Sequence, residues 1–192
     1  NGLAGLSAPR WIGLSADDAR VFVLANGTGS LASFARDSAT GALSLQGQAR
    51  EGQGGALGLL GALGARLSPD GQHVYVAAGD AAAVAHYRVS ALGAPQFAGI
   101  VREGDEAAAG ARVLGLTGTA DLLLSPDGSQ VYALGRSAAA LASFERPLDA
   151  APAELSGDLV YRDALFDGPG GVAPGREVSY RIEVWNDGPS SV

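Results

Sequence analysis

The chain has 192 residues and a formal net charge of −7, with no cluster of basic residues, so nucleic acid and anionic membrane surfaces are unfavourable partners. Cysteine is absent, which excludes a disulfide framework, a thiol nucleophile and a zinc–thiolate site. Hydrophobic residues make up 47% of the chain, yet no apolar run approaches the roughly 20 residues that a membrane span requires.

One sequence pattern recurs three times along the chain. Each copy has a serine, a tight turn and, six residues after the serine, a valine followed by an aromatic residue. The serines are Ser15, Ser68 and Ser125, which are 53 and 57 residues apart. Repetition at a period near fifty in a chain rich in strand patterns is typical of the blades of a β-propeller.

Each copy predicts four short antiparallel strands. The first ends at the serine, the second is V-F-V-L, V-Y-V-A or V-Y-A-L, and the third is L-A-S-F, V-A-H-Y or L-A-S-F. Short apolar segments separated by Gly, Asp and Pro favour strands, and four such strands make one blade. We therefore predict an all-β fold with three four-stranded antiparallel blades at about 11–52, 63–104 and 120–163, which form a partial β-propeller over residues 1–163.

The turn after each serine is explained by turn chemistry. Pro69-Asp70-Gly71 and Pro126-Asp127-Gly128 predict hairpin turns in which glycine adopts the left-handed conformation. The first copy has Ala16-Asp17-Asp18 instead, and Asp is among the few residues other than glycine that tolerate that conformation. Asp17, Asp70 and Asp127 are therefore interpreted as turn residues in separate blades rather than as a ring of metal ligands.

Two further features repeat at fixed places. Thirteen residues after the valine comes an aromatic residue just before an arginine, and later an arginine–acid pair marks the end of the last predicted strand. The aromatic residues are Phe34, Tyr87 and Phe144, their arginines are Arg36, Arg88 and Arg146, and the pairs are Arg50-Glu51, Arg102-Glu103 and Arg162-Asp163. The pairs could form an anion site with arginine forks or inter-blade ion pairs, and we favour ion pairs.

Long connections rich in Gly and Leu separate the blades, from Gly52 to Ala65 and from Gly104 to Ala120. Connections of this length are either functional or structured loops. Gly54-Gly55 lacks the following Lys-Ser/Thr of a phosphate-binding loop. The first ten residues look like the end of another connection, so we expect the chain to begin between blades of a longer polypeptide.

The pattern changes after residue 163. Gly168–Gly171 predicts a linker, and Val178, Tyr180, Ile182 and Val184 alternate with polar residues as in a half-buried strand of a sandwich. Residues 164–192 are therefore predicted to be a linker and an incomplete Ig-like domain. The position of Trp185 on the polar side of that strand has no explanation in the sequence.

The two histidines are the remaining candidates for chemistry. His73 directly follows a hairpin turn, and His86 takes the position of Ser33 and Ser143 in the other copies. A paired role in catalysis or metal binding would need a carboxylate beside them. We expect surface histidines, and the sequence assigns no catalytic, cofactor-binding or metal residue and no cofactor.

The segment L-S-P-D-G-Q-H-V-Y-V, the aromatic-x-Arg step and the turn Thr40–Leu43 resemble bacterial lactonase-like, YVTN-type β-propeller repeats over residues 1–163. The segment A-P-G-R-E-V-S-Y-R-I-E-V-W-N-D-G-P-S resembles the opening of an Ig-like repeat domain of unknown function in bacterial surface proteins. The resemblance implies a propeller followed by Ig-like modules in a large bacterial protein that is secreted or attached to the cell surface.

Three functions remain open. The main hypothesis is a non-catalytic structural, adhesion or binding module; the alternatives are a lactonase-like hydrolase with its site outside this segment and a propeller that binds carbohydrate or peptide. Propellers use about 4–8 blades, and an open arc leaves bare strand edges. We therefore expect the remaining blades of a parent chain, or another copy, to cover those edges, with a glycan or protein as candidate ligand and with no nucleic acid and no membrane insertion.

Overall fold

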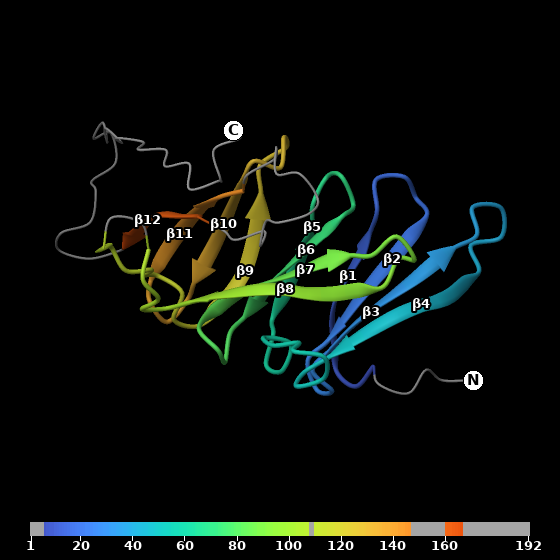
Figure 1. Ribbon diagram of the computed structural model, residues 1–192, viewed down its shortest axis with the longest axis horizontal. Helices are drawn as coiled ribbons and strands as arrows, with labels where there is room; N and C mark the ends of the chain where they lie inside the picture. Colours follow the sequence, from blue (N-terminus) through green and yellow to red (C-terminus); the bar gives the residue numbers. More distant parts are fainter. Residues whose placement is uncertain (1–5, 108–109, 147–159, 167–192) are drawn as a thin grey trace, which may run out of the picture.

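The computed structural model describes residues 6–107, 110–146 and 160–166. Within these ranges the chain forms twelve strands in three four-stranded antiparallel sheets. The three sheets stand side by side along the long axis of the molecule (Figure 1). The prediction of an all-β fold with three propeller blades is confirmed.

The strands of each sheet are hydrogen-bonded in chain order. Blade 1 consists of β1 (Pro9–Leu14), β2 (Arg20–Ala25), β3 (Ser30–Arg36) and β4 (Leu43–Arg50). Blade 2 consists of β5 (Gly64–Leu67), β6 (His73–Ala78), β7 (Ala83–Val89) and β8 (Pro95–Arg102). Blade 3 consists of β9 (Thr119–Leu124), β10 (Gln130–Gly135), β11 (Ala140–Glu145) and β12 (Val160–Phe166). The first strand of blade 2, β5, contacts the first strands of both other blades, β1 and β9.

The turn after each serine has the predicted structure. In all three blades the serine Oγ donates a 2.5 Å hydrogen bond to Oδ1 of the turn aspartate. The same Oγ accepts the backbone N–H five residues after the serine, at 2.9–3.0 Å. The left-handed position is held by Asp18 (φ 59°), Gly71 (φ 68°) and Gly128 (φ 73°). Asp18 therefore replaces glycine in the first copy, as the sequence predicted.

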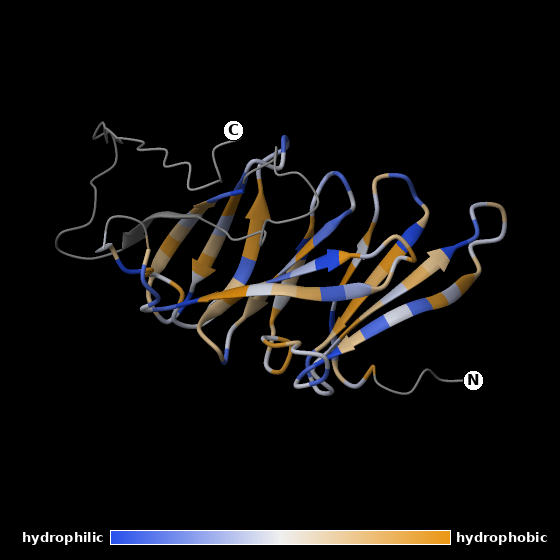
Figure 2. Cartoon of the chain, in the orientation of Figure 1, coloured by the Kyte–Doolittle hydropathy of each residue, from blue (hydrophilic) through white to orange (hydrophobic). Residues whose placement is uncertain are grey.

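Apolar side chains fill the space between neighbouring blades, and Figure 2 shows hydrophobic residues along the central strands of each sheet. We call the face of a blade that packs on the following blade its trailing face, and the opposite face its leading face. The trailing-face residues Phe22, Leu24 and Leu31 of blade 1 pack with the leading-face residues Val74, Val76, Ala85 and Tyr87 of blade 2. The trailing-face residues Tyr75, Ala77 and Val84 of blade 2 pack with the leading-face residues Val131, Ala133, Ala142 and Phe144 of blade 3.

The connections between blades are structured and belong to the same cores. Ala56, Leu59 and Ala62 pack into the cluster between blades 1 and 2, and Val113 and Leu116 pack into the cluster between blades 2 and 3. Burying these apolar side chains removes them from water, so the connections add to the stability of the blade interfaces.

The acidic residues after β4 and β8 bind these connections, so the preference for inter-blade ion pairs was wrong for Glu51 and Glu103. The carboxylate of Glu51 accepts the backbone N–H groups of Gly58 (3.3 Å), Leu59 (2.7 Å) and Leu60 (3.1 Å). Glu103 accepts the N–H of Leu116 at 2.5 Å. A loop without regular structure has backbone N–H groups that need acceptors, and these two carboxylates are acceptors for four of them.

The third arginine–acid pair was misplaced. In blades 1 and 2 the arginine pairs with the first residue of the third strand, as Ser30 with Arg50 and Ala83 with Arg102. In blade 3 the residue in that place is Phe166, opposite Ala140. Arg162 and Asp163 lie instead at an irregularity in the pairing of β11 with β12, where blades 1 and 2 have similar irregularities. The Arg162-Asp163 match to the other pairs was therefore wrong.

The predicted linker and Ig-like segment, 164–192, lies outside the described residues apart from the three that end β12. The same holds for Trp185. Within the part of the chain that the structure describes, no helix is long and apolar enough to cross a membrane.

Candidate functional site

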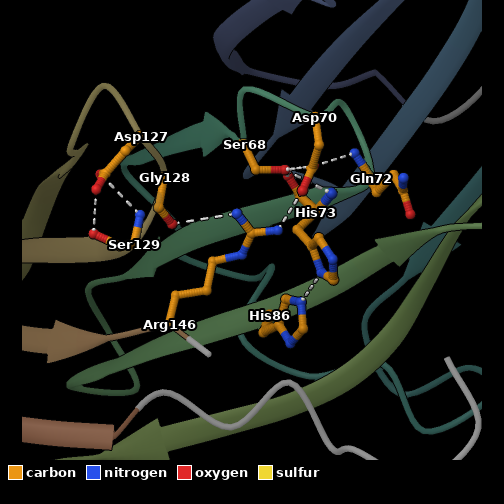
Figure 3. A network of polar contacts seen from close by, with 9 residues as sticks. All are labelled: Ser68, Asp70, Gln72, His73, His86, Asp127, Gly128, Ser129 and Arg146. Carbon is orange, nitrogen blue, oxygen red and sulfur yellow. Dashed lines mark hydrogen bonds and ion pairs between the residues drawn. The ribbon is translucent and has the colours of Figure 1, made fainter. Parts of the chain in front are cut away.

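A polar network crosses the interface between blades 2 and 3 (Figure 3). Arg146, just after β11, is only 8% exposed. Its Nη2 donates to Oδ2 of Asp70 in the serine turn of blade 2 (2.5 Å), and its Nη1 donates to the carbonyl of Gly128 in the serine turn of blade 3 (3.2 Å). The guanidinium thus joins the equivalent turns of two blades, and such charge-assisted bonds are stronger than neutral ones.

The charge state of Asp70 follows from these contacts. Partial burial alone would raise the pKa of the carboxyl group, but the hydrogen bonds from Ser68, Arg146 and the N–H of Gln72 outweigh it and lower the pKa to about 2. Asp70 uses Oδ1 for Ser68 and Gln72 and Oδ2 for Arg146. At neutral pH it is therefore an ionised acceptor whose oxygens both have donors.

The two histidines lie together in this interface, so the expectation of surface histidines was wrong. His86, on β7, is 3% exposed, and His73, at the start of β6, is half-buried. His73 Nδ1 and His86 Nε2 are 2.8 Å apart and share a hydrogen bond. The ring of His86 also stacks on Tyr75, with centroids 4.9 Å apart. The side chains face blade 3 because Tyr75 lies on the trailing face and pairs with His86 across the sheet.

Burial shifts the titration of this cluster. It lowers the pKa of His73, an effect that the nearby positive charges of Arg146 and Arg88 increase and that Asp70 opposes. Burial also raises the pKa of the Tyr75 hydroxyl to about 12. At neutral pH the rings of His73 and Tyr75 are therefore uncharged, which suits their stacked position between two blades.

The contacts of the network define what it can do chemically. An activated serine nucleophile donates to a base whose pKa lies near the working pH. Ser68 Oγ donates instead to Asp70, whose pKa of about 2 makes it a weak base, and accepts the backbone N–H of His73. A neutral, half-exposed histidine can accept a proton, so His73 has the property that a general base requires. Among the described residues no group of three His, Asp or Glu side chains is placed to hold a metal ion. The other contacts of the network fix turns and join blades.

The sequence contains a signal for the role of Arg146. Arg36 has the equivalent place in blade 1, two residues after the aromatic residue, and its Nη1 donates to the carbonyl of Asp18 (3.3 Å), the counterpart of Gly128. Blade 2 has Val89 in that place, and Val89 packs on the apolar cluster between blades 1 and 2. The aromatic-x-Arg step therefore marks an inter-blade contact in blade 3 and the equivalent hydrogen bond to a turn carbonyl in blade 1.

The remaining candidates are separate from this network. Asp17 holds its own turn in blade 1, with Oδ1 accepting from Ser15 and from the N–H of Ala19. Arg50 Nε donates to Gln48 within blade 1. Gly54 and Gly55 have positive φ values, 58° and 81°, in the first connection. The structure does not bring these residues together with the histidines.

Solved structures with a similar fold include two proteins whose names describe them as gluconolactonases. The periplasmic gluconolactonase of Pseudomonas aeruginosa is 22% identical with a TM-score of 0.62, and the similarity covers 83% of this chain and 40% of that one. A putative 6-phosphogluconolactonase of Bacteroides fragilis is 19% identical with a TM-score of 0.63, covering 84% and 39%. A protein of Lactobacillus plantarum is 21% identical with a TM-score of 0.63, covering 89% and 45%.

These similarities establish the fold. No protein family model matches the sequence, and no curated protein matches it. The chain spans about two fifths of the length of the solved propellers that it matches.

Proposed function

We propose that this chain provides three blades of a lactonase-like propeller that hydrolyses a sugar lactone, with the reacting groups contributed outside the described residues. The observation that carries the proposal is the similarity of the three-blade arc to propellers named as gluconolactonases. A shared fold does not by itself imply a shared reaction, so the reaction needs its own test.

The arrangement of the blades is compatible with this proposal. The first strands of the blades, β1, β5 and β9, are neighbours, as they are where strands line the centre of a propeller. The serine–aspartate turns, the two glutamates that bind the connections and the Arg146 contact all stabilise blades and their order. In this proposal the chain contributes scaffold, and lactone ring opening needs acid–base groups and a stabilised oxyanion from the rest of the propeller.

The experiment compares two polypeptides. Hydrolysis of glucono-1,5-lactone and of 6-phosphogluconolactone is measured for the 192-residue chain and for the longest natural polypeptide that contains it. The proposal predicts turnover by the longer polypeptide that survives His73→Gln and His86→Ser in the folded variants. Loss of turnover in folded His73→Gln would place the reacting groups in the network between blades 2 and 3. No turnover of either lactone by a folded longer polypeptide would contradict the hydrolase.

The second candidate is a non-catalytic module for spacing, adhesion or ligand binding. The observation that favours it is the use of the polar groups: Ser68, Asp70 and Arg146 bind one another and the backbone. A glycan array probed with the longer polypeptide tests the binding form of this hypothesis. A specific glycan without lactone turnover would favour it over the hydrolase.

We also propose that the protein is exported and that residues 164–192 lead into an Ig-like domain. The sequence alternation from Val178 to Val184 supports the second part, and the name of the periplasmic Pseudomonas enzyme is consistent with export. Fractionation of the natural host tests the location. A stable proteolytic fragment that starts near residue 173 of the longer polypeptide is the expected sign of a separate domain.

A further inference from the structure

Arg88 on β7 is a cation whose side chain lacks an acceptor. It lies on the trailing face of blade 2, because it pairs with His73 across the sheet, two residues from the Tyr75–His86 pair that faces blade 3. Its Nε is buried and makes no hydrogen bond, and within the described ranges no carboxylate forms an ion pair with its guanidinium. A buried N–H without an acceptor costs free energy, so a ligand that supplies an acceptor is bound favourably.

His73 places a second donor beside Arg88. Nδ1 of His73 shares a hydrogen bond with His86 (Figure 3), while Nε2 of His73 has no hydrogen-bond partner among the described residues. Nε2 carries a hydrogen when His86 donates to Nδ1, and also when the ring is protonated. Directly opposite residues of an antiparallel pair have Cβ atoms about 4.5–5.5 Å apart, so one small ligand can reach both Arg88 and His73.

The charges around these two donors are positive in sum. Arg88 and Arg146 are cations, whereas Asp70 is the one carboxylate that contacts the network within the described part of the chain, and both of its oxygens already accept hydrogen bonds. The hydroxyl of Tyr75 is uncharged at neutral pH, since burial raises its pKa to about 12. Burial and then the charges of Arg146 and Arg88 lower the pKa of His73, against the opposing effect of Asp70. An anion beside Arg88 therefore balances an excess of positive charge.

The combination of an arginine and a histidine at these positions is specific to blade 2. The strand register gives the equivalent cross-strand pairs in the other two blades, which are Arg20 with Ala35 in blade 1 and Gln130 with Glu145 in blade 3. Both of those blades form the same four-stranded sheet without the combination. The fold therefore does not require Arg88 or His73, and a binding role accounts for a cation that has no acceptor.

We propose that Arg88 and His73 form a binding site for a small oxyanion beside the interface between blades 2 and 3. The guanidinium of Arg88 donates to one oxygen of the ligand, and Nε2 of His73 donates to another. The planar fork of arginine matches the oxygens of a carboxylate or a phosphate, so the ligand is a sugar acid or a phosphate compound. This site is independent of the reaction proposed above.

The test follows the imidazole signals of His73 by NMR in the longest natural polypeptide that contains this chain, with His73→Gln assigning those signals. Gluconate and inorganic phosphate are titrated separately, and glucose is the uncharged control. We expect saturable shifts of the His73 signals with the anions and none with glucose, and the anion that binds more tightly identifies the source of the ligand. Bound gluconate should also raise the pKa of His73, because a nearby negative charge favours the protonated ring.

Arg88→Ala introduces the residue that blade 1 has at this position, Ala35, so the blade should keep its fold, which circular dichroism verifies. We expect it to weaken binding of the anion by roughly tenfold or more, because it removes a charge-assisted hydrogen bond. The matched control is Arg136→Ala, which removes an exposed arginine at the opposite end of blade 3 and should leave the affinity unchanged. His73 signals that respond to neither anion in the folded polypeptide would overturn the proposal, as would an affinity that survives Arg88→Ala.

Discussion

Replacing Glu51 by alanine tests whether a carboxylate holds the connection between blades 1 and 2. The variant removes the acceptor of three backbone N–H groups, those of Gly58, Leu59 and Leu60. Gly58 and Leu59 are buried, while Leu60 is exposed and can bind water. An unsatisfied buried donor costs about 1–3 kcal/mol, so two of them predict a loss of about 2–4 kcal/mol once some water enters the space left by the side chain.

The equivalent change at Glu103 gives a matched comparison. Glu103 accepts one backbone N–H, that of the buried Leu116. Glu103→Ala should therefore cost about 1–2 kcal/mol, clearly less than Glu51→Ala. Glu51→Gln keeps one carbonyl oxygen and should lie between the wild type and Glu51→Ala.

Urea unfolding followed by circular dichroism measures these differences. For a chain of this length a loss of 1 kcal/mol lowers Tm by roughly 2–4 °C, so thermal unfolding gives a second reading. Both are done at the lowest workable protein concentration, because self-association would stabilise the folded chain. A Glu103→Ala variant as unstable as Glu51→Ala, or a Glu51→Gln variant as unstable as Glu51→Ala, would refute the argument from counted donors.

Three further predictions concern single side chains. Tyr87→Phe removes the hydrogen bond from the tyrosine hydroxyl to the carbonyl of Leu57 (2.7 Å) and should lower the free energy of unfolding in urea by about 1 kcal/mol. No clash is expected, because Phe occupies this place in the other two blades. An unchanged stability would mean that water replaces the hydrogen bond fully. Gly71→Ala puts a side chain at φ 68°, and the nearest atom is 3.9 Å from the added Cβ. Backbone strain alone should therefore lower the free energy of unfolding by about 1–2 kcal/mol. A larger loss of stability would contradict the open space around this position. Burial lowers the pKa of His73 from 6.5, so the unfolded chain binds the proton more tightly and the stability of the folded chain should fall as pH drops from 6.5 toward the lowered value. His73→Gln should reduce this dependence of stability on pH in unfolding curves measured from pH 7.5 to 5. An equal pH dependence in both proteins would assign the effect to other groups.

The strands and turns were predictable because their causes are local. Alternating apolar residues, the Pro-Asp-Gly turns and the Asp18 replacement all act within one blade. The prediction for the third arginine–acid pair was wrong because it relied on a local match alone. That match of residue types placed Arg162 at the strand end, while the strand register puts Phe166 there. Register depends on partners across the sheet, which a one-dimensional pattern does not contain.

The positions of the histidines and of Glu51 depend on neighbouring blades. His86 occupies a position where blade 1 has a completely buried serine, Ser33, and it lies two residues after Val84 on the same face of β7. That alternation was available in the sequence. The hydrogen bonds of Glu51 were not, because they join it to residues of a connection whose path is set by packing between two blades.

The serine turn has a second role that the repeat pattern did not reveal. Its aspartate uses Oδ1 within the blade, while Oδ2 of Asp70 accepts from Arg146 of the next blade. Asp70→Asn, with its amide oxygen toward Ser68, can keep the turn and should lose the ion pair, which leaves Arg146 buried without its carboxylate. Asp127→Asn changes the same turn in blade 3, where no Arg146 equivalent is bound within the chain that the structure describes.

Asp70→Asn should therefore destabilise the folded chain more than Asp127→Asn. Its effect should also depend on pH, because the pKa of Asp70 falls from 3.8 to about 2 on folding. The stability that this carboxylate contributes is present above pH 3.8 and is lost as pH falls toward 2, so the wild type and Asp70→Asn should converge in acid. Equal stability of the two asparagine variants at neutral pH would show that the turn, and not the inter-blade contact, determines the cost. The comparison thus separates the two oxygens of one residue, the first of which shapes a blade and the second of which orders the blades.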